Sequence, residues 1–387
     1  MVAGRWLAAV ALTISTVTLR PTGVAAQPAA RPADSVVRPV AAPARGLPSE
    51  AASARVTRFS FIVYGDTRGP RDGTEVQAVH SMIVESMLKK IAELKSGPDP
   101  VRFVIQSGDG VVNGGVAAQW NVSYTPVVER LTREGGVPYY LAPGNHDVSS
   151  ADSARAPLRL ARMPNYYAVT SKTIPQSGPR RLRGYPTFAF GYGNTFVIGF
   201  DSNIAGDTIQ FAWVKAQLEH LDRRRWTHVV MFAHHPAYSS GPHGGAIVET
   251  STRIIREKWM PLFRANGVDM FFVGHEHFFE HWAEEWRDAK GAWRRLDQVV
   301  TGGGGAPIYT YRGNPDLTAY LAAGARDSLR VTQIVRPGAD STQNPHHYVV
   351  VHVDGAKVWQ EVVGVDWGRD YAPYRTARID LGEPKRP

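Results

Sequence analysis

Five short apolar segments, each followed at once by a cluster of glycine and polar residues, constrain the fold of this chain more than any other feature. Their β-branched and aromatic residues indicate buried β-strands. The segments are residues 59–64, 101–106, 138–142, 228–233 and 268–273. Between them, residues 76–94, 209–221 and 252–265 carry apolar residues at helical spacing. This alternation predicts a layered α/β fold with helices on both faces of the sheet.

Polar clusters follow all five predicted strands. They are Gly65-Asp66, Gly108-Asp109, Gly144-Asn145-His146-Asp147, His234-His235-Pro236 and Gly274-His275-Glu276-His277. Each cluster alone is more typical of a turn or a buried histidine than of a metal site. However, ligands of open α/β sheets bind at the carboxyl ends of the strands, where all of these clusters lie. Together they predict one site, assembled from distant parts of the sequence.

Other parts of the chain carry weaker signals. Residues 180–200 are expected to add further strands, and residues 293–301 and 347–353 to add late antiparallel strands. Residues 147–186 show little periodicity, so we expect loops over the site there.

The two ends of the chain differ from its middle. Residues 1–26 combine a positive start, an apolar run of about 14 residues and small residues before the expected cleavage point, which is typical of a secretory signal peptide. A membrane-spanning helix needs roughly 20 apolar residues, so we expect cleavage rather than an uncleaved anchor. Residues 27–56 are rich in Ala and Pro and predict a linker. A folded domain over 57–364, a tail over 365–387, and a secreted or periplasmic protein without stable membrane insertion are expected.

Composition restricts the chemistry of this domain. Of its 387 residues 43% are hydrophobic and 20% charged, as in globular proteins. Cysteine is absent, so any metal must use nitrogen and oxygen ligands. The formal charge is +9, of which Arg5 and Arg20 of the predicted signal peptide supply two. A basic surface favours anionic ligands, but the arginines form no stripe of the kind that binds nucleic acid, so a small anion is favoured over nucleic acid as the partner.

The polar clusters combine three carboxylate or amide oxygens with three or four imidazoles. Such ligands suit zinc, manganese or iron. Two ions about 3.5–4 Å apart would hold both the attacking and the leaving oxygen of an in-line phosphoryl displacement. A carboxylate such as Asp109 could bridge them. The pattern therefore predicts a metal centre for phosphoryl chemistry.

The order of the clusters resembles that of the calcineurin-like metallophosphoesterases, which include purple acid phosphatases and cyclic-nucleotide phosphodiesterases. Gly144-Asn145-His146-Asp147 and Gly274-His275-Glu276-His277 are the specific motifs, and the two Gly-Asp motifs gain weight from their order. The resemblance covers roughly residues 58–364. It implies a layered β-sandwich core flanked by helices, and two divalent or trivalent metal ions (manganese, zinc or iron).

The resemblance also implies roles for single residues. The implied metal ligands are Asp66, Asp109, Asn145, His234, His275 and His277. Asp109 would bridge the ions, with Asp66 and His277 on the first and the other three on the second. His146 would face the phosphate and the leaving group without being a ligand. Asp147 would orient His146 through the N–H group of its ring.

The first motif departs from the family pattern. Many members have Asp-x-His there, and this histidine binds the first ion, whereas the present chain has Asp66-Thr67-Arg68. A guanidinium stays protonated and cannot ligate a metal. Purple acid phosphatases compensate with a tyrosine in the second motif, but Val112 stands at that position. The first ion is then expected to bind weakly or with water. Arg68 either grips a phosphate oxygen or forms an ion pair under the loop.

Three residues are predicted to contact the substrate, namely Arg68, Asn113 and His243. His243 lies in a polar, glycine-rich run just beyond a predicted ligand, and an ordinary surface loop is the alternative. His235 is expected to be structural. Residues 302–305 are all glycine and indicate close backbone packing, because no Lys-Ser/Thr follows as in a phosphate-binding loop.

The sequence thus predicts a metal-dependent hydrolase that cleaves phosphomonoesters or phosphodiesters with a metal-activated water. Arg68, His146 and Asp147 are its predicted catalytic residues. One alternative is a nuclease on the same scaffold, although no duplex-binding module is evident. The other is a metal-stabilised phosphate-binding protein without catalysis, which Arg68 suggests.

Overall fold

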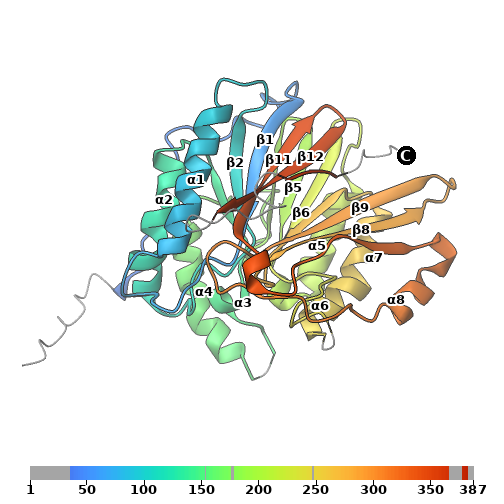
Figure 1. Ribbon diagram of the computed structural model, residues 1–387. Helices are drawn as coiled ribbons and strands as arrows, with labels where there is room; N and C mark the ends of the chain where they lie inside the picture. Colours follow the sequence, from blue (N-terminus) through green and yellow to red (C-terminus); the bar gives the residue numbers. More distant parts are fainter. Residues whose placement is uncertain (1–34, 153, 176–177, 246–247, 366–376, 382–387) are drawn as a thin grey trace, which may run out of the picture. The chain divides into compact units, whose positions relative to one another are not determined.

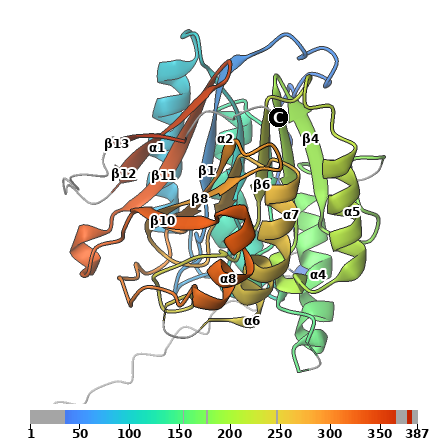
Figure 2. The same cartoon turned by 90° about the vertical axis from the view of Figure 1, so that its right-hand side faces the viewer.

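Two β-sheets form the centre of the structure, and helices lie on their outer faces (Figures 1 and 2). The computed structural model describes residues 35–152, 154–175, 178–245, 248–365 and 377–381. These residues belong to the compact unit Pro32–Pro387. The predicted signal peptide lies outside the described residues. No helix within them is both long and apolar enough to cross a membrane.

The first sheet has six strands in the order β13-β12-β11-β1-β2-β3. In chain order they are β1 Arg58–Tyr64, β2 Val101–Gln106, β3 Tyr139–Leu141, β11 His346–Asp354, β12 Lys357–Val365 and β13 Ala377–Asp380. Strands β1, β2 and β3 are parallel, whereas β11 is antiparallel to β1. The carboxyl ends of the three parallel strands therefore lie at one edge, as predicted.

The second sheet has seven strands in the order β10-β8-β9-β7-β6-β5-β4. They are β4 Phe188–Tyr192, β5 Thr195–Gly199, β6 His228–Phe232, β7 Met270–Val273, β8 Phe279–Arg287, β9 Trp293–Thr301 and β10 Arg330–Val335. Strands β5, β6, β7 and β9 are parallel. The antiparallel pairing predicted for residues 293–301 is confirmed between β9 and β8. The other neighbour of β9, strand β7, is parallel to it.

The helices connect the strands and cover the sheets. They are α1 Ala78–Leu94, α2 Thr125–Arg133, α3 Asn145–Val148, α4 Ala156–Thr170, α5 Thr208–Glu219, α6 Thr250–Ile254, α7 Met260–Ala265 and α8 Thr318–Ala323. Short π- or 3-10-helical turns occur at Gln119–Tyr124, Ser202–Ile204, Ile255–Trp259, Ala325–Asp327 and Ser341–Gln343.

Three apolar clusters hold the layers together. Between the sheets, Phe61 of β1 meets Phe272 of β7 with 6.0 Å between ring centroids. Outside the first sheet, Met87 of α1 belongs to the cluster that also contains buried strand residues. Outside the second sheet, Phe263 of α7 lies 5.4 Å from the ring of Phe271. The layered β-sandwich flanked by helices is thus confirmed.

Residues 147–186 differ from the prediction, because they contain helix α4 where we expected loops. The helix carries Pro164 in its interior and exposes Leu158 and Leu160, at 50% and 79%. Its buried residues, Tyr166 among them, lie near its carboxyl end. A helix that packs by one end and breaks the apolar pattern with proline leaves no periodic signal in the sequence.

Residues 35–56 contact the domain, whereas their composition had suggested a free linker. Val37 and Val40 are buried, and the amide of Val40 donates to the carbonyl of Val169 at the end of α4. Arg38 donates to Asn121 through its backbone amide and its guanidinium. In the predicted tail, β13 pairs with β12. The exact domain limits stay a prediction.

Candidate metal centre

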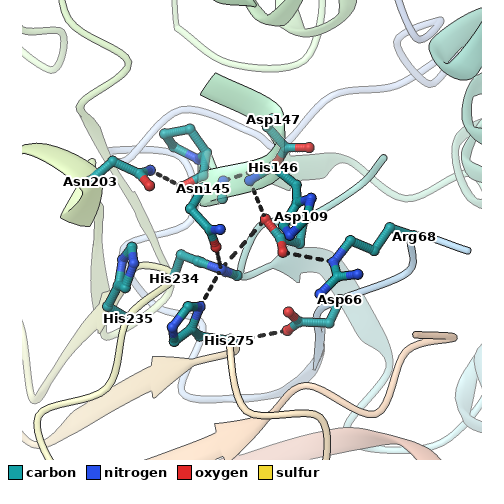
Figure 3. Close-up of polar contacts among 12 residues, drawn as sticks. Asp66, Arg68, Asp109, Asn145, His146, Asp147, Asn203, His234, His235 and His275 are labelled. Atoms are coloured by element: carbon teal, nitrogen blue, oxygen red, sulfur yellow. Dashed lines mark hydrogen bonds and ion pairs between the residues drawn. The ribbon is translucent and has the colours of Figure 1, made fainter. Parts of the chain in front are cut away.

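The loops after five parallel strands converge on one group of polar side chains (Figure 3). Asp66 follows β1, Asp109 follows β2, Asn145 begins α3 after β3, His234 follows β6, and His275 follows β7. Ligand atoms of Asp66, Asp109 and His234 lie within 4.8 Å of one another. The structure therefore brings residues from both sheets to one place, which a single cluster of the sequence could not show.

Backbone strain marks the same positions. Five described non-glycine residues have positive φ, and three of them are Asp66, Asp109 and His275, at 60°, 54° and 72°. Such a left-handed conformation of a non-glycine residue costs about 1–3 kcal/mol and concentrates at functional sites. The strain turns three side chains toward a common centre.

Two glycines allow the loops to approach each other. A Cβ atom on Gly144 would collide with the carboxylate and backbone of Asp109. A Cβ atom on Gly274 would collide with the carboxylate of Asp66. These glycines are therefore required for the close approach of two carboxylates to neighbouring strands.

The ring of His234 lies at the centre of the second predicted ligand set. Its Nε2 atom is 2.9 Å from Oδ1 of Asn145, 3.1 Å from Nδ1 of His275 and 3.5 Å from Oδ1 of Asp109. Four donor atoms of the kinds that bind zinc, manganese or iron thus face one another.

The outer nitrogens of the predicted histidine ligands are all hydrogen-bonded. His234 Nδ1 lies 2.9 Å from the carbonyl of Ser107, and His277 Nδ1 lies 2.7 Å from that of Pro307. His275 Nε2 lies 3.1 Å from Oε2 of Glu249. Such bonds fix the tautomer and orient the free nitrogen toward a metal, as is usual for metal-bound histidines.

Burial sets the charge of this cluster. It lowers the pKa of His234 and His275, and that of His277 to about 3, so the rings are neutral and can act as ligands. Burial and the charge of Asp109 raise the pKa of Asp66, whose Oδ1 atom is buried without a hydrogen-bond partner. Burial also opposes the charge of Asp109, but the neighbouring histidines and Arg68 outweigh it and lower its pKa. An orphaned carboxylate oxygen beside neutral imidazoles fits a cation site.

Arg68 contacts the first predicted ligand set directly. Its Nε atom donates to Oδ2 of Asp109 at 3.1 Å, and its Nη2 atom lies 3.2 Å from Nε2 of His277. Asp66 is close by, with Oδ1 3.5 Å from the same His277 nitrogen. The ion pair that was one alternative for Arg68 is therefore present, and its contact with a phosphate oxygen stays a prediction.

His146 lies beside the cluster, but Asp147 does not contact its ring. The backbone amide of His146 donates to Oδ1 of Asp109, and its Nδ1 atom lies 2.7 Å from the carbonyl of Val112. Asp147 instead accepts from the amides of Gly144 and Val111. Asp147 is the third residue of helix α3, so its carboxylate folds back onto the start of that helix. The orientation expected from Asp147 is supplied by Val112.

The other two predicted substrate contacts differ. Asn113 lies in a turn, where its side-chain oxygen accepts from the amide of Gly115, and within the described residues its side chain has no hydrogen bond to a predicted ligand. His243 lies next to the cluster, with its ring 4.4 Å from that of His275. Burial opposes its charge, but Glu276 and Glu249 outweigh it and raise the pKa of His243. His243 is therefore placed to carry a positive charge near an anionic substrate.

Two residues of the site escaped prediction. Glu249 precedes α6 and forms, with His235 and His275, a second group that could hold a metal. Tyr309 stacks on His277 with 3.9 Å between ring centroids. Both lie in loops without a motif, so no pattern in the sequence marks them. His235, expected to be structural, hydrogen-bonds through Nδ1 to Ser202 at 2.8 Å.

A cavity of about 900 Å³ opens beside the cluster. Asn145, His235 and Glu249 line it on the side of the predicted ligands, and Arg155 and Asp207 line it farther away. Its volume is in the range of pockets for small organic ligands. The cavity connects the ligand cluster with space for a substrate.

Known proteins similar to this chain point in one direction. The calcineurin-like phosphoesterase family matches residues 60–279, more than half of the chain. Serine/threonine-protein phosphatase CPPED1 of Bos taurus is 25% identical over 226 residues, which cover 56% of this chain and 63% of the bovine protein. Purple acid phosphatase 17 of Arabidopsis thaliana is 24% identical over 241 residues, 58% of this chain and 64% of the plant protein. The match therefore spans less than two thirds of both relatives.

Solved structures show the same fold. Purple acid phosphatase PPD1 from yellow lupin seeds has a TM-score of 0.59 at 17% identity, covering 82% of this chain and 53% of the lupin chain. GAP50 of Plasmodium, described as the anchor in the inner membrane complex, has a TM-score of 0.53 at 14% identity, covering 86% of this chain and 90% of that chain.

Proposed function

Because the chain belongs to the calcineurin-like phosphoesterase family, we propose that it is a metal-dependent hydrolase of phosphomonoesters or phosphodiesters. The observation that carries this proposal is the convergence of Asp109, Asn145 and His275 on Nε2 of His234. Relatives named as phosphatases support a hydrolase and imply divalent metal ions. The identity of the metal and the ester that is cleaved belong to the proposal.

These four residues fit one divalent ion. Asp109 is held by the amide of His146, and the outer nitrogens of His234 and His275 are anchored. When bound there, such an ion would supply a Lewis acid and an activated water. The chain therefore orients the ligands before a metal arrives, which lowers the cost of assembling the site.

His146 has the geometry of a proton donor to the leaving oxygen. The Val112 carbonyl holds its Nδ1 atom, which leaves Nε2 for the substrate. His146 contacts Asp109 only through its backbone, so its ring is outside the ligand set. General acid catalysis of this kind contributes roughly 10²–10⁴ in rate.

His243 and the cavity would hold the rest of the substrate. The ring of His243 faces Glu276 and Glu249, which favour its charged form. The cavity of about 900 Å³ beside Asn145 has room for the leaving group. A cationic ring that faces Glu249, a residue of the cavity lining, supports a phosphate ester with an organic leaving group of small size.

Of the two predicted metal sites, the structure supports only the one formed by the second ligand set. The second ligand set is assembled without interruption. In the first set, Asp109 and His277 contact Arg68.

Hydrolysis of chromogenic esters tests the proposal. Protein stripped with a chelator and reloaded with Mn²⁺ or Zn²⁺ should hydrolyse nitrophenyl phosphate or bis(nitrophenyl) phosphate, and the stripped protein should not. His234→Ala should abolish turnover, whereas His220→Ala, which alters an exposed histidine after α5, should not change it. Turnover that survives removal of the metal would refute metal dependence.

A phosphate-binding protein without catalysis is the alternative, because Arg68 contacts Asp109 and His277 of the first ligand set. In that case the protein would bind metal and inorganic phosphate but hydrolyse neither ester. Cleavage of single-stranded DNA by the loaded protein would instead favour a nuclease. The same preparation thus separates the three functions.

Secretion or export to the periplasm is also proposed, on the signal-peptide pattern of residues 1–26. The intact mass of exported protein should correspond to a chain that begins at Gln27. A mass that retains Met1 would contradict export by cleavage.

A further inference from the structure

The guanidinium of Arg68 occupies the atoms that a first metal ion would need. Nε donates to Oδ2 of Asp109 at 3.1 Å, and Nη2 lies 3.2 Å from Nε2 of His277. The Asp109 oxygen that accepts from Arg68 is Oδ2, whereas Oδ1 is the oxygen that lies near His234. Oδ2 is thus the oxygen that Asp109 would offer to the first ion. The arginine therefore lies between two of the three side chains predicted to hold the first ion.

The tautomer of His277 is consistent with this contact. Nδ1 of His277 lies 2.7 Å from the carbonyl of Pro307, so Nδ1 carries the proton. Nε2 then has a lone pair, and it accepts a hydrogen bond from Arg68. The lone pair that would bind a metal is thus already used by a donor that cannot be deprotonated.

The contact is enclosed. Only 17% of the Arg68 side chain and 1% of Asp109 are exposed. Tyr309 stacks on the ring of His277, at 3.9 Å between ring centroids and 18° between the rings. A guanidinium buried against a carboxylate is held by charge as well as by geometry. Displacement of Arg68 would leave its guanidinium without the carboxylate of Asp109.

The second ligand set has no such competitor. The shortest distances of His234 Nε2 are to Asn145 and His275, which are both neutral. Among the described residues, no arginine or lysine hydrogen-bonds to the side chain of Asn145, His234 or His275. The two predicted ligand sets therefore differ. The ligand atoms of Asn145, His234 and His275 are available to a metal ion, whereas the guanidinium of Arg68 contacts Asp109 and His277 of the first set.

We infer that this centre binds a single metal ion, held by Asp109, Asn145, His234 and His275, and that Arg68 replaces the first ion as a permanent positive charge. The inference rests on the proposed function for the ion in the second set. A guanidinium offers charge and N–H donors to a phosphate oxygen, but it cannot activate water. Of the two roles of a metal ion, stabilising negative charge and activating water, Arg68 would thus take over only the first.

Metal stoichiometry tests the inference. The protein should be equilibrated with Mn²⁺ or Zn²⁺, freed of excess ion and analysed for bound metal per chain. We expect one equivalent for the wild-type protein. The Mn²⁺ form should show the electron paramagnetic resonance spectrum of an isolated ion. Two equivalents, or the signal of an exchange-coupled pair, would overturn the inference.

Substitution of Arg68 provides the second arm. Arg68→His removes the guanidinium and restores an imidazole beside Asp66, whose Oδ1 atom has no partner. Both Arg68→His and Arg68→Met should raise the stoichiometry from one to two equivalents. Arg162→Met removes a nearby positive charge that contacts only backbone carbonyls of Asn145 and His146, and it should leave the stoichiometry at one. An unchanged stoichiometry in the folded Arg68 variants would contradict the replacement.

The outcomes also separate this inference from the proposed function. Two equivalents in the wild type would refute the role of Arg68 and leave a metal-dependent hydrolase intact. No bound metal at all would refute both. If a variant fails to fold, as judged by its circular dichroism and melting, the wild-type stoichiometry alone still decides the question.

Discussion

At the scale of single residues, the ligand cluster is arranged by its outer contacts as much as by its motifs. His275 illustrates this, because its Nε2 atom lies 3.1 Å from Glu249 while Nδ1 faces His234. If Glu249 accepts the proton of Nε2, the lone pair of Nδ1 is directed to the metal. The carboxylate is 40% exposed, so its contribution comes from orientation more than from charge.

We therefore expect Glu249→Ala to weaken metal binding about 10–100-fold, as is typical when such an outer partner is lost. Chelator competition with Zn²⁺ measures the affinity. Glu257→Ala, on the turn that follows α6 and exposed to solvent, should have no effect. Equal affinities of the Glu249 variant and the wild type would show that His275 is oriented without this carboxylate.

For His146, the expected effect depends on the leaving group. His146→Ala should retain the metal, because the ring is anchored to Val112 and not to the ligands. Alkyl esters should slow by roughly 10²–10⁴, since their alkoxide needs a proton, and nitrophenyl esters should slow less. Steady-state rates on both ester types, with metal analysis, make the comparison. Loss of metal would mean that His146 is a ligand, and equal slowing would mean that it stabilises the phosphoryl group instead.

Single residues of the site could be predicted where they stand in a sequence motif. The candidate ligands could be predicted because all except His234 stand in Gly-Asp, Gly-Asn-His-Asp and Gly-His-x-His patterns, and the structure brings them together. Glu249 and Tyr309 lie in loops without such patterns. The contact of Arg68 with His277 joins residues that are 209 positions apart, and a pairing at that distance has no sequence signal.

At the scale of elements, strands were easier to predict than helices. All residues of β6 and β7 are buried, which gives continuous apolar runs. Helix α5 exposes Ile209 at 59% and still matched its predicted range. The buried residues of α5 recur every four positions along the helix, whereas those of helix α4 gather at its carboxyl end. Predictability of the helices thus followed the spacing of their buried residues.

Strand β8 contains a buried carboxyl group that should make stability depend on pH. Glu280 accepts hydrogen bonds from the amide of Ser240 at 3.0 Å and from Gln333 at 2.6 Å. Burial raises its pKa to about 7, from the usual 4.5. Because the folded pKa is raised, the neutral form is favoured by folding, and the stabilisation is complete below about pH 4.5. It is lost as the pH rises to 7, by roughly 3 kcal/mol in total.

Glu280→Gln should remove this dependence. Unfolding by urea at several pH values between 4.5 and 8 measures it, as the difference in unfolding free energy between wild type and variant. Glu285→Gln, on the same strand but partly exposed, serves as the control and should follow the wild type. A difference that does not change with pH would show that Glu280 is charged in the folded protein at all these values.

At the scale of the whole described unit, the segment before β1 is part of the fold. Its composition is poor in large apolar residues, which predicted a linker, but Val37 and Val40 are buried in the cluster around α1 and α2. Glu50 also pairs with Arg180, and its carbonyl accepts from Arg225. Composition averages over a segment, whereas a few anchoring residues suffice to dock it.

A chain that begins at Ser35 should accordingly be more stable than one that begins at Thr57. Burial of a valine is worth about 1.5–3 kcal/mol, so loss of Val37 and Val40 should cost roughly 3 kcal/mol or more in unfolding free energy. Thermal and urea unfolding of the two chains gives the difference. Equal stability would mean that residues 35–56 lie on the domain without contributing to it.

The number and position of bound metal ions test the central claim most directly. Crystals of the protein grown with Zn²⁺ or Mn²⁺ should be measured at the absorption edge of the metal. We predict one anomalous peak, enclosed by Asp109, Asn145, His234 and His275, with Arg68 still bound to Asp109 and His277. A map without a peak among these four residues, or with its only peak between His235 and Glu249, would contradict the proposed metal centre.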